Sequence, residues 1–289
     1  MKRRLLGIFA CAALLLCGCS QTADEAQTSI PETLPPIEEP ALMYYVTDHG
    51  TVDVSAVSQF QSAIEDKGYI FRADALSALS MDADAVILNA PREDLTAEEQ
   101  QQLEAYMHTG GHLLLMMPAD ESDMRYKYLE RFLEHYSIRM DYDRLAETDK
   151  SMMLDGDPQC MQIRQVHAPS GMTIEPATAE QPLYMQNVRS FHFVVQDNYS
   201  NLRMDAMLES SQTVIGEPCG GGFDDPERFE NAALMTMLYS RDTQQNNAFV
   251  VCVGASDFLL DENYDAQTSQ SAQDYVYAAL DWAAHPTGF

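Results

Sequence analysis

Short apolar runs alternate with amphipathic segments along most of this chain, starting near residue 41. Apolar runs of about four to eight residues, bounded by Gly, Pro, Asp or Asn, are typical of buried strands. We expect such strands at residues 41–47, 69–73, 83–90, 112–117, 231–240 and 248–254. Apolar residues at helical spacing predict helices at 54–68, 96–110, 124–138 and 271–284. Such an alternation predicts an open, mostly parallel, doubly wound α/β sheet.

The stretch 85–117 contains the most complete repeat of this pattern. An apolar strand leads into an acidic loop containing Pro91, and a polar helix, two glycines and a second apolar run follow. Thr96 and Glu99 have the spacing of a capping box, which satisfies free amides at a helix start. Gly110 is placed to end this helix in the left-handed conformation. The uninterrupted run "HLLLMM" indicates a strand that is covered on both faces, as in parallel sheets.

Residues from about 141 to 225 interrupt the alternation. This region combines turn residues with short apolar pieces, and no helical spacing is evident in it. We therefore expect a single α/β domain at 41–289 with a peripheral β-rich insertion at about 141–225.

The first residues predict export and lipidation. Residues 1–18 have a basic start, an apolar stretch and small residues at the end, which is typical of a secretory signal and too short for a comfortable membrane span. The sequence Leu16-Cys17-Gly18-Cys19 resembles the lipobox of bacterial lipoproteins, in which the Cys at the position of Cys19 is acylated. We expect an extracytoplasmic protein anchored to the cell membrane through Cys19. Residues 19–40 are rich in Pro, Thr and Glu and predict a disordered tether.

Charge and cysteine content exclude several classes of protein. There are 45 acidic but only 17 basic residues, which gives a formal net charge of -28. An acidic surface repels nucleic acid, which proteins bind by neutralising phosphates with Lys and Arg. Apart from Cys19, the cysteines beyond the signal are Cys160, Cys219 and Cys252, an odd number without CxxC spacing. These cysteines indicate neither a zinc site nor a disulfide framework, and at most one bridge can form.

The carboxyl ends of the expected strands define a candidate crevice. In open α/β sheets, ligands bind outside these ends. The sequence therefore predicts a crevice lined by Asp48, His49, Gly50, Asn89, Pro91, Asp120, Ser256 and Asp257.

The same residues provide weak grounds for catalysis. A serine nucleophile needs a histidine base, which His49 could supply to Ser256. However, "VGASDF" lacks the second glycine of a G-x-S-x-G elbow, so we expect Ser256 to cap a helical turn and Asp257 to accept backbone amides. Cys252 lies within an apolar run, where a thiol is buried and inert.

The sequence also gives no ground for a metal site or a cofactor. The acidic runs 224–227 and 261–265 contain oxygen ligands that suit Ca²⁺, but they lack the spacing of an EF-hand. We expect solvated loops at both runs, and we expect no catalytic residue, metal or cofactor.

Four stretches resemble a known family, the extracytoplasmic domain of gliding-motility-type auxiliary proteins of ABC-2 transport systems. They are residues 44–51 ("YYVTDHGT"), 82–117, 229–238 and 250–263. The stretch 82–117 carries most of the resemblance, through its strand, Pro loop, capped helix, Gly-Gly pair and strand. The resemblance implies a flavodoxin-like or class I amidotransferase-like α/β domain that works outside the membrane beside a permease and an ATPase. It brings no catalytic residues with it.

The chain departs from the family's pattern at two points. In the turn after the first strand, Asp48 stands where the family has Gly and Thr51 stands where it has an acid, so only His49 and Gly50 carry over. Family members commonly have membrane helices, whereas this sequence has the signal for a lipid anchor.

The leading hypothesis is a lipid-anchored, non-catalytic accessory or binding domain of an ABC-type transport system. Its expected partners are the membrane, through the anchor, and the permease or ATPase, with no nucleic acid. Two alternatives stay open. One is a secreted hydrolase or amidotransferase-like enzyme that uses Ser256 or Cys252 with His49, and the other is a lipoprotein that binds a small ligand or a glycan.

Overall fold

The computed structural model of the chain describes residues 39–119, 125–169, 172, 174, 182–194, 201–219, 233–244 and 246–285. These residues belong to one compact unit that begins at Glu39. The signal, most of the tether, Cys19, Asp120 and the acidic run 224–227 lie outside the described residues. Within the described ranges, no helix combines the length and apolar character needed to cross a membrane.

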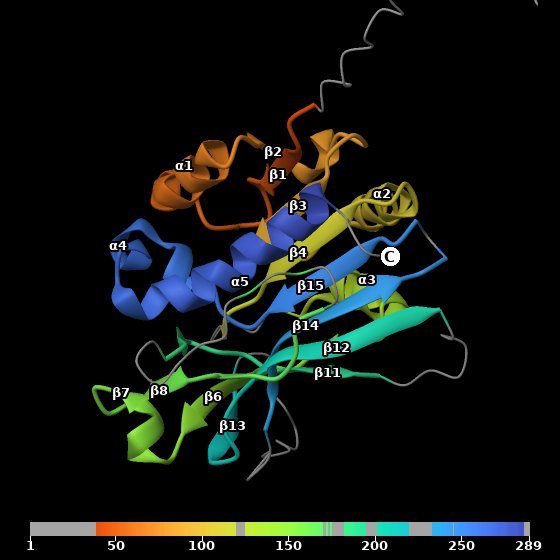
Figure 1. Ribbon diagram of the computed structural model, residues 1–289. Coiled ribbons are helices and arrows are strands. Elements are labelled where there is room, and N and C mark those ends of the chain that lie inside the picture. Colours follow the sequence, from red (N-terminus) through yellow and green to blue (C-terminus); the bar gives the residue numbers. More distant parts are fainter. Residues whose placement is uncertain are drawn as a thin grey trace, which may run out of the picture. The chain divides into compact units, whose positions relative to one another are not determined.

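Five parallel strands form one side of the largest sheet, with β2 at its edge, in the order β2–β1–β3–β4–β15 (Figure 1). Their bounds are β1 Leu42–Val46, β2 Ile70–Asp74, β3 Ala85–Asn89, β4 His112–Met116 and β15 Phe249–Val253. If β15 is counted as the fifth strand, this is the 2-1-3-4-5 order of flavodoxin-like sheets, which reverses direction between β1 and β3. The expected open, mostly parallel α/β sheet is confirmed.

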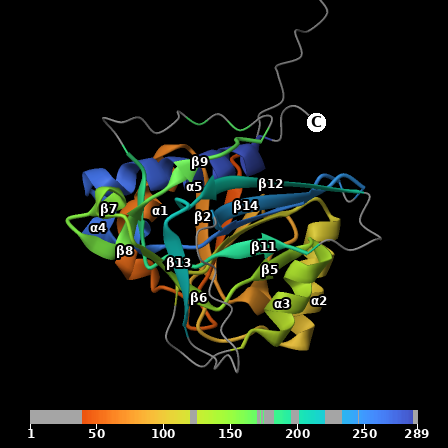
Figure 2. The same ribbon diagram turned by 90° about the horizontal axis from the view of Figure 1, so that it is seen from below.

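Helices cover both faces of this sheet (Figures 1 and 2). On one face lie α1 Ser58–Asp66 and α5 Gln267–Ala284, and on the other lie α2 Ala97–His108 and α3 Lys127–His135. Each face has its own apolar core because side chains alternate along a strand. In β3, for example, Ile87 belongs to the core on the α5 side and Leu88 to the core on the α2 side. The apolar continuity of the strands thus reflects burial on two sides.

Antiparallel strands extend the sheet beyond β15 and form the β-rich insertion. β14 Met235–Asp242 pairs antiparallel with β15, and the sheet continues through β11 Phe191–Phe193 to β5 Ile138–Met140. β12 Leu202–Glu209 also pairs with β14, and β9 Arg164–Gln165 pairs with β12.

Two small sheets complete the insertion and appear at the bottom of Figure 1. One has the order β10–β8–β7, and the other pairs β13 with β6. Their bounds are β6 Asp143–Glu147, β7 Met153–Leu154, β8 Asp157–Gln162, β10 Tyr184–Gln186 and β13 Val214–Pro218. The expected β-rich insertion is confirmed.

Most elements form where the sequence pattern predicts them, although several boundaries shift: α5 begins at Gln267, four residues before the expected start, and β14 is Met235–Asp242 where 231–240 was expected. The helix expected at 124–138 ends at His135, because Ser137 adopts a left-handed φ of 56° and Ile138 begins β5. The capping box at α2 forms as expected: Thr96 accepts from the backbone of Glu99, and the Glu99 side chain accepts from the backbone of Thr96. Gly110 follows this helix with a φ of 98°, which favours glycine.

Gly254, directly after β15, lies in close backbone contact with Arg189 of the insertion. A Cβ atom at this position would lie 2.0 Å from the carbonyl oxygen of Arg189. The Gly254 backbone also donates to Thr236 and accepts from Arg189. Only a residue without a side chain permits this approach.

We predict that Gly254→Ala lowers the free energy of unfolding by about 3 kcal/mol or more, because the clash is with backbone that cannot rotate away. Urea unfolding followed by circular dichroism measures the loss. Gly68→Ala is the matched control: its φ is 85° but no atom lies within 4 Å of its added Cβ. It should cost only about 1–2 kcal/mol, from backbone strain. Equal losses in the two variants would contradict the contact.

Candidate functional site

The loops that follow β1 and β3 meet at the point where the strand order reverses. The carbonyl oxygen of His49 accepts from the backbone amides of Arg92 (2.7 Å) and Glu93 (2.9 Å). The amide of Val52 donates to the carbonyl of Asn89 at 3.1 Å. This reversal is where flavodoxin-like sheets bind their ligands, so it is the first place to look for a site.

His49 lies in a tight turn that begins at Asp48. The amide of Thr51 donates to the carbonyl of Asp48 at 3.3 Å, and the two central residues have positive φ angles, 60° for His49 and 63° for Gly50. Two left-handed central residues define a type I′ turn, which glycine adopts freely and histidine at a cost. The His49 residue is only 9% exposed. A strained, buried histidine at a strand end is unusual enough to suggest a role.

The hydrogen bonds of His49 leave one ring nitrogen facing two carboxylates. Its Nδ1 lies 3.1 Å from the carbonyl oxygen of Asp94, and because a carbonyl only accepts, Nδ1 is the protonated nitrogen. Its Nε2 lies 3.3 Å from Oε1 of Glu99 and 3.6 Å from Oδ1 of Asp48. The Nε2 atom is buried and makes no hydrogen bond. In the neutral ring this nitrogen is an acceptor that faces two further acceptors.

The carboxylates of Asp48 and Glu99 both accept hydrogen bonds from backbone amides. Asp48 accepts from the amide of Leu76 through both oxygens, at 3.1 and 3.2 Å. Oε2 of Glu99 accepts from the amide (2.8 Å) and the hydroxyl (2.7 Å) of Thr96. Partial burial would raise the pKa of the Glu99 carboxyl, but the bonds from Thr96 and the nearby His49 outweigh burial and lower it. Glu99 is therefore ionised.

Asp94 ties the loop after β3 to helix α3. Its carboxylate accepts from the amides of Tyr128 (2.9 Å) and Leu129 (3.1 Å) in the first turn of the helix. These amides have no partner within the helix, and an acid satisfies them while opposing the positive end of the helix dipole. The hydroxyl of Tyr126 also donates to the carbonyl of Pro91 at 2.7 Å. The loop is thus bonded at several points.

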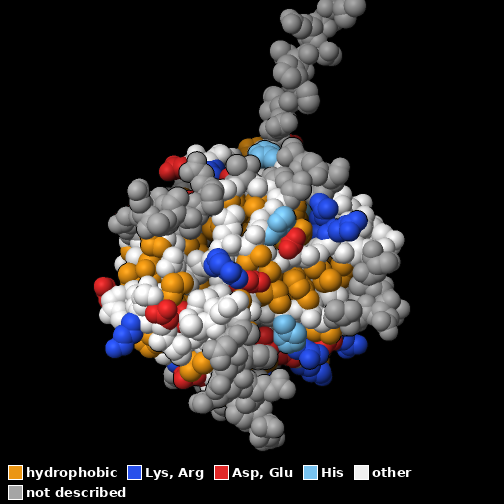
Figure 3. Space-filling view, turned by 60° about the horizontal axis from the view of Figure 1, so that its bottom comes forward, with side chains coloured by type: hydrophobic (Ala, Val, Ile, Leu, Met, Phe, Trp, Pro, Cys, Tyr) orange, Lys and Arg blue, Asp and Glu red, His pale blue; other side chains and the backbone are white. Residues whose placement is uncertain are grey.

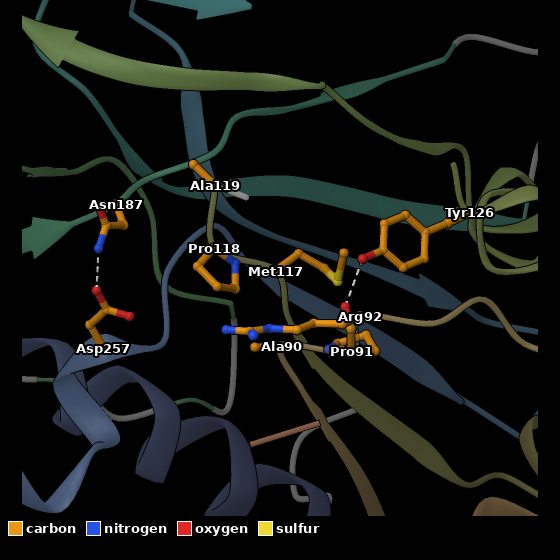
Figure 4. Close-up of a pocket in the computed structure, with 9 residues that line it drawn as sticks. All are labelled: Ala90, Pro91, Arg92, Met117, Pro118, Ala119, Tyr126, Asn187 and Asp257. Carbon is orange, nitrogen blue, oxygen red and sulfur yellow. Dashed lines mark hydrogen bonds between the residues drawn. The ribbon is translucent and has the colours of Figure 1, made fainter. Parts of the chain in front are cut away.

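A small pocket of about 160 Å³ opens beside these loops (Figure 4). It is lined by Ala90, Pro91, Arg92, Met117, Pro118, Ala119, Tyr126, Asn187 and Asp257. The Arg92 side chain extends across it toward Asp257, whose carboxylate accepts from the Asn187 amide. Burial raises the pKa of the Asp257 carboxyl, the Asn187 bond opposes this shift, and the nearby Glu262 adds to it. This volume suits only a small molecule, since pockets for drug-sized ligands span about 300–1,000 Å³.

The predicted crevice residues separate into two groups. Asp48 and His49 form the cluster described above, and Gly50 completes their turn. Pro91 and Asp257 line the pocket. Asp120 lies outside the described residues.

Asn89 does not line a crevice, so that prediction is wrong. It is fully buried, and its side-chain amide donates to the hydroxyl of Tyr45 at 3.2 Å. The physical reason is that β3 continues through Asn89, so the strand alternation turns this side chain toward the core on the α5 side.

The expected roles of Ser256 and Asp257 are also corrected. Ser256 occupies the N-cap position of the 3₁₀ turn Asp257–Leu259, but its side chain makes no capping bond and it is 2% exposed. Asp257 bonds the Asn187 side chain, not the backbone amides of the turn. Among the described residues, Ser256 is not a partner of His49, whose ring contacts Asp94, Glu99 and Asp48.

Glu99 is the residue of this site that the sequence reasoning missed. Its capping box with Thr96 was recognised, but only as a helix signal. A capping acid in the first turn after a parallel strand also lies at the carboxyl edge of the sheet. That position brings Glu99 next to His49 in the turn after β1, although β2 and β3 separate the two residues in the chain.

The three cysteines in the described residues are buried and form no disulfide with one another. Cys252 is fully buried, and burial raises the pKa of its thiol far above its ordinary value. Burial, aided by Asp157 and Asp155, raises the pKa of Cys160 to about 11. A thiol in this state is a poor nucleophile, because the thiolate is the reactive form.

The acidic run 261–265 is not the loop that its sequence predicts, because Asp261–Tyr264 forms the short helix α4. Asp261 accepts from the amides of Ser58 (3.1 Å) and Gln59 (2.9 Å) at the start of α1. These bonds lower the pKa of its carboxyl. Asp261 is therefore a capping residue supplied from a distant part of the chain.

One face of the molecule, seen in Figure 3, carries a mixed surface. Acidic and basic side chains lie singly or in small groups between separate patches of apolar side chains. This face therefore offers mixed polar and apolar contacts in place of a field of one sign.

Comparison with known proteins identifies the fold alone. No family model and no curated protein sequence matches the chain. Among solved structures, the chain is similar to the mmIFT52 N-terminal domain, with a TM-score of 0.62 and 14% identity over 86% of this chain and 98% of that one.

Two further structures are less similar. α-L-fucosidase isoenzyme 2 from Paenibacillus thiaminolyticus has a TM-score of 0.47 and 10% identity, and the chain spans 33% of its length and aligns over 84% of its own. PurLQS from Thermotoga maritima has a TM-score of 0.31 and 10% identity, over 82% of this chain and 100% of that one. These two similarities carry no argument about function.

We predict that Asp94→Ala lowers the free energy of unfolding by about 1–2 kcal/mol, because two amides at the start of α3 lose their acceptor. Urea unfolding measures the change. Asp94→Asn is the control, since an amide oxygen still accepts, and its loss should be clearly smaller. If the two variants unfolded at the same urea concentration, the capping role would be wrong.

We also predict that a thiol reagent labels Cys252 only after unfolding, because the native thiol is fully buried. Mass spectrometry of the digested protein separates this cysteine from the others. Cys160, at 9% exposure, should react sooner than Cys252. Selective labelling of native Cys252 would instead favour a nucleophilic thiol.

Proposed function

We propose that this protein is a non-catalytic binding domain, anchored by a lipid on Cys19 to the outer side of the cell membrane, and an accessory component of an ABC-type transport system. The lipobox-like end of residues 1–18 supports the anchor and the location. The resemblance of residues 82–117 to the auxiliary proteins of ABC-2 systems supports the partner. The acidic charge supports the absence of nucleic acid among its ligands.

The observation that supports a non-catalytic role is that the His49 ring contacts other residues and not a candidate nucleophile among the described residues. This histidine is the only candidate base that the sequence singled out at a strand end, and its ring contacts Asp94, Glu99 and Asp48. The two candidate nucleophiles, Ser256 and Cys252, are buried. A nucleophile needs a base within hydrogen-bonding reach, and neither is paired with His49 among the described residues.

We expect Cys19→Ser to release the protein from the membrane fraction of bacterial cells, because the thiol that receives the lipid is gone. Immunoblotting of membrane and soluble fractions measures the release. Cys17→Ser, two residues away and on the same apolar stretch, should leave the protein membrane-bound. Release by both variants, or by neither, would refute the anchor at Cys19.

The partner is tested by chemical crosslinking in intact cells, followed by capture of the protein and identification of what it carries. The expected result is a permease or ATPase of the ABC class, recovered with the wild-type protein and lost with Cys19→Ser. Reproducible recovery of unrelated soluble proteins alone would contradict the transport association. Labelling of Ser256 by a serine-directed probe would contradict the non-catalytic role.

The pocket favours one alternative, a lipoprotein that binds a small ligand. Arg92 and Asp257 place a cation and an acid on its walls, and its volume is about 160 Å³. A ligand there would be a few heavy atoms with both donor and acceptor groups.

A further inference from the structure

The buried imidazole of His49 and the carboxylates of Asp48 and Glu99 form a compact cluster. One oxygen of each carboxylate and Nε2 of His49 all lie within 4.8 Å of one another. Nδ1 already donates to a backbone carbonyl, so Nε2 presents a lone pair to two negative groups. This nitrogen is buried and makes no hydrogen bond, which is costly unless a positive species lies between the three atoms.

We infer that these three side chains bind a divalent transition-metal ion of the zinc type, in a position where sequence alone indicated no metal. Zinc accepts imidazole nitrogen at about 2.0–2.1 Å and carboxylate oxygen at about 2.0–2.2 Å in a tetrahedron, so neighbouring ligand atoms lie roughly 3.3–3.5 Å apart. The separations from Nε2 to Glu99 and Asp48 are 3.3 and 3.6 Å. The edge from Nε2 to Glu99 has the required length, and the edge from Nε2 to Asp48 is slightly longer.

The hydrogen-bond partners of the three side chains are those typical of metal ligands. A metal-binding histidine usually donates its other ring nitrogen to a carbonyl or carboxylate, and ligand carboxylates are themselves hydrogen-bonded. Here His49 donates to the Asp94 carbonyl, Asp48 accepts from Leu76, and Glu99 accepts from Thr96. His49 and Glu99 are thus oriented through one polar atom and keep the other for the ion, whereas Asp48 presents Oδ1, which also accepts from Leu76.

A proton on Nε2 is the competing explanation, because an imidazolium would also attract two carboxylates. The distances speak against it: 3.3 and 3.6 Å are longer than the roughly 2.7–2.9 Å of a hydrogen bond from a cationic N–H to a carboxylate. Separations of this size are closer to those between neighbouring ligand atoms of one metal ion. The Asp48 side chain is 35% exposed, whereas those of His49 and Glu99 are 8% and 14% exposed. Solvent therefore reaches the site on the Asp48 side and supplies the remaining ligand.

The test uses the full-length protein in detergent, carrying an affinity tag without histidine and stripped with a chelator. Isothermal titration calorimetry with ZnCl₂ should show one ion per chain, and CoCl₂ should give the visible absorption of a four-coordinate site. The melting temperature should rise on adding Zn²⁺, because the folded state binds the ion.

Two variants probe the ligands with little risk to the fold. His49→Asn keeps a residue that tolerates a positive φ, and Glu99→Gln keeps an oxygen that completes the capping box. Each should weaken Zn²⁺ binding at least about tenfold, since loss of even an outer partner costs about 10–100-fold. The matched control is His135→Gln: this exposed histidine lies 3.3 Å from Glu104 without a third ligand in the described residues.

The inference stands if the wild-type protein and His135→Gln bind Zn²⁺ equally while His49→Asn and Glu99→Gln lose binding and keep their circular dichroism spectra. It fails if the stripped wild-type protein takes up no metal, which would leave a proton between the three groups. It also fails if the variants at positions 49 and 99 bind as the wild type does. These outcomes are independent of the lipid anchor and of any transport partner.

Discussion

The parallel pairing of β1 with β3 is the constraint on which the carboxyl edge of this protein depends. These strands are neighbours in the sheet although β2 lies between them in the chain. The loops that follow them therefore meet at the point where the strand order reverses. Parallel strands direct all their carboxyl ends to one edge, and apolar cover on both faces leaves the edge as the place where polar side chains gather. His49, Asp94 and Glu99 meet there for this reason.

Hydrogen bonds to backbone amides connect the loops at the carboxyl edge of the sheet. One carbonyl of His49 receives two amides from the loop after β3, and the carboxylate of Asp94 receives two amides from α3. Buried backbone groups need partners, and here the partners come from three separate parts of the chain. These backbone bonds fix the positions of the loops after β1 and β3. The side chains of the same loops then form the cluster around the imidazole and line part of the neighbouring pocket.

Much of the fold could be predicted from the sequence because local pattern and tertiary burial agree. The strand runs around Val86 and Leu114 are apolar throughout, and the Thr96–Glu99 box marks a helix start wherever the helix packs. The insertion could be located but not traced, since its strands are as short as two residues and pair with distant partners. Asn89 was misplaced because one polar residue at the end of an apolar run gives no sign of whether the strand includes it.

The site could be predicted only in part, for a related reason. Strand ends identified Asp48 and His49, because the position of a strand end follows from local pattern. The third member, Glu99, belongs to another element and reaches the imidazole only through the order of strands in the sheet. The bonds of Asp257 and Asp261 depend likewise on residues 70 and about 200 positions away. Sequence spacing carries no information about contacts between residues so far apart in the chain.

Asp94 serves two neighbours at once, the ring of His49 through its carbonyl and the first turn of α3 through its carboxylate. Asp94 therefore joins the turn after β1 to the first turn of α3, on the face of the sheet opposite α5. A substitution at this single position removes the carboxylate bonds to α3, whereas the bond to the ring comes from the backbone and does not depend on the side chain.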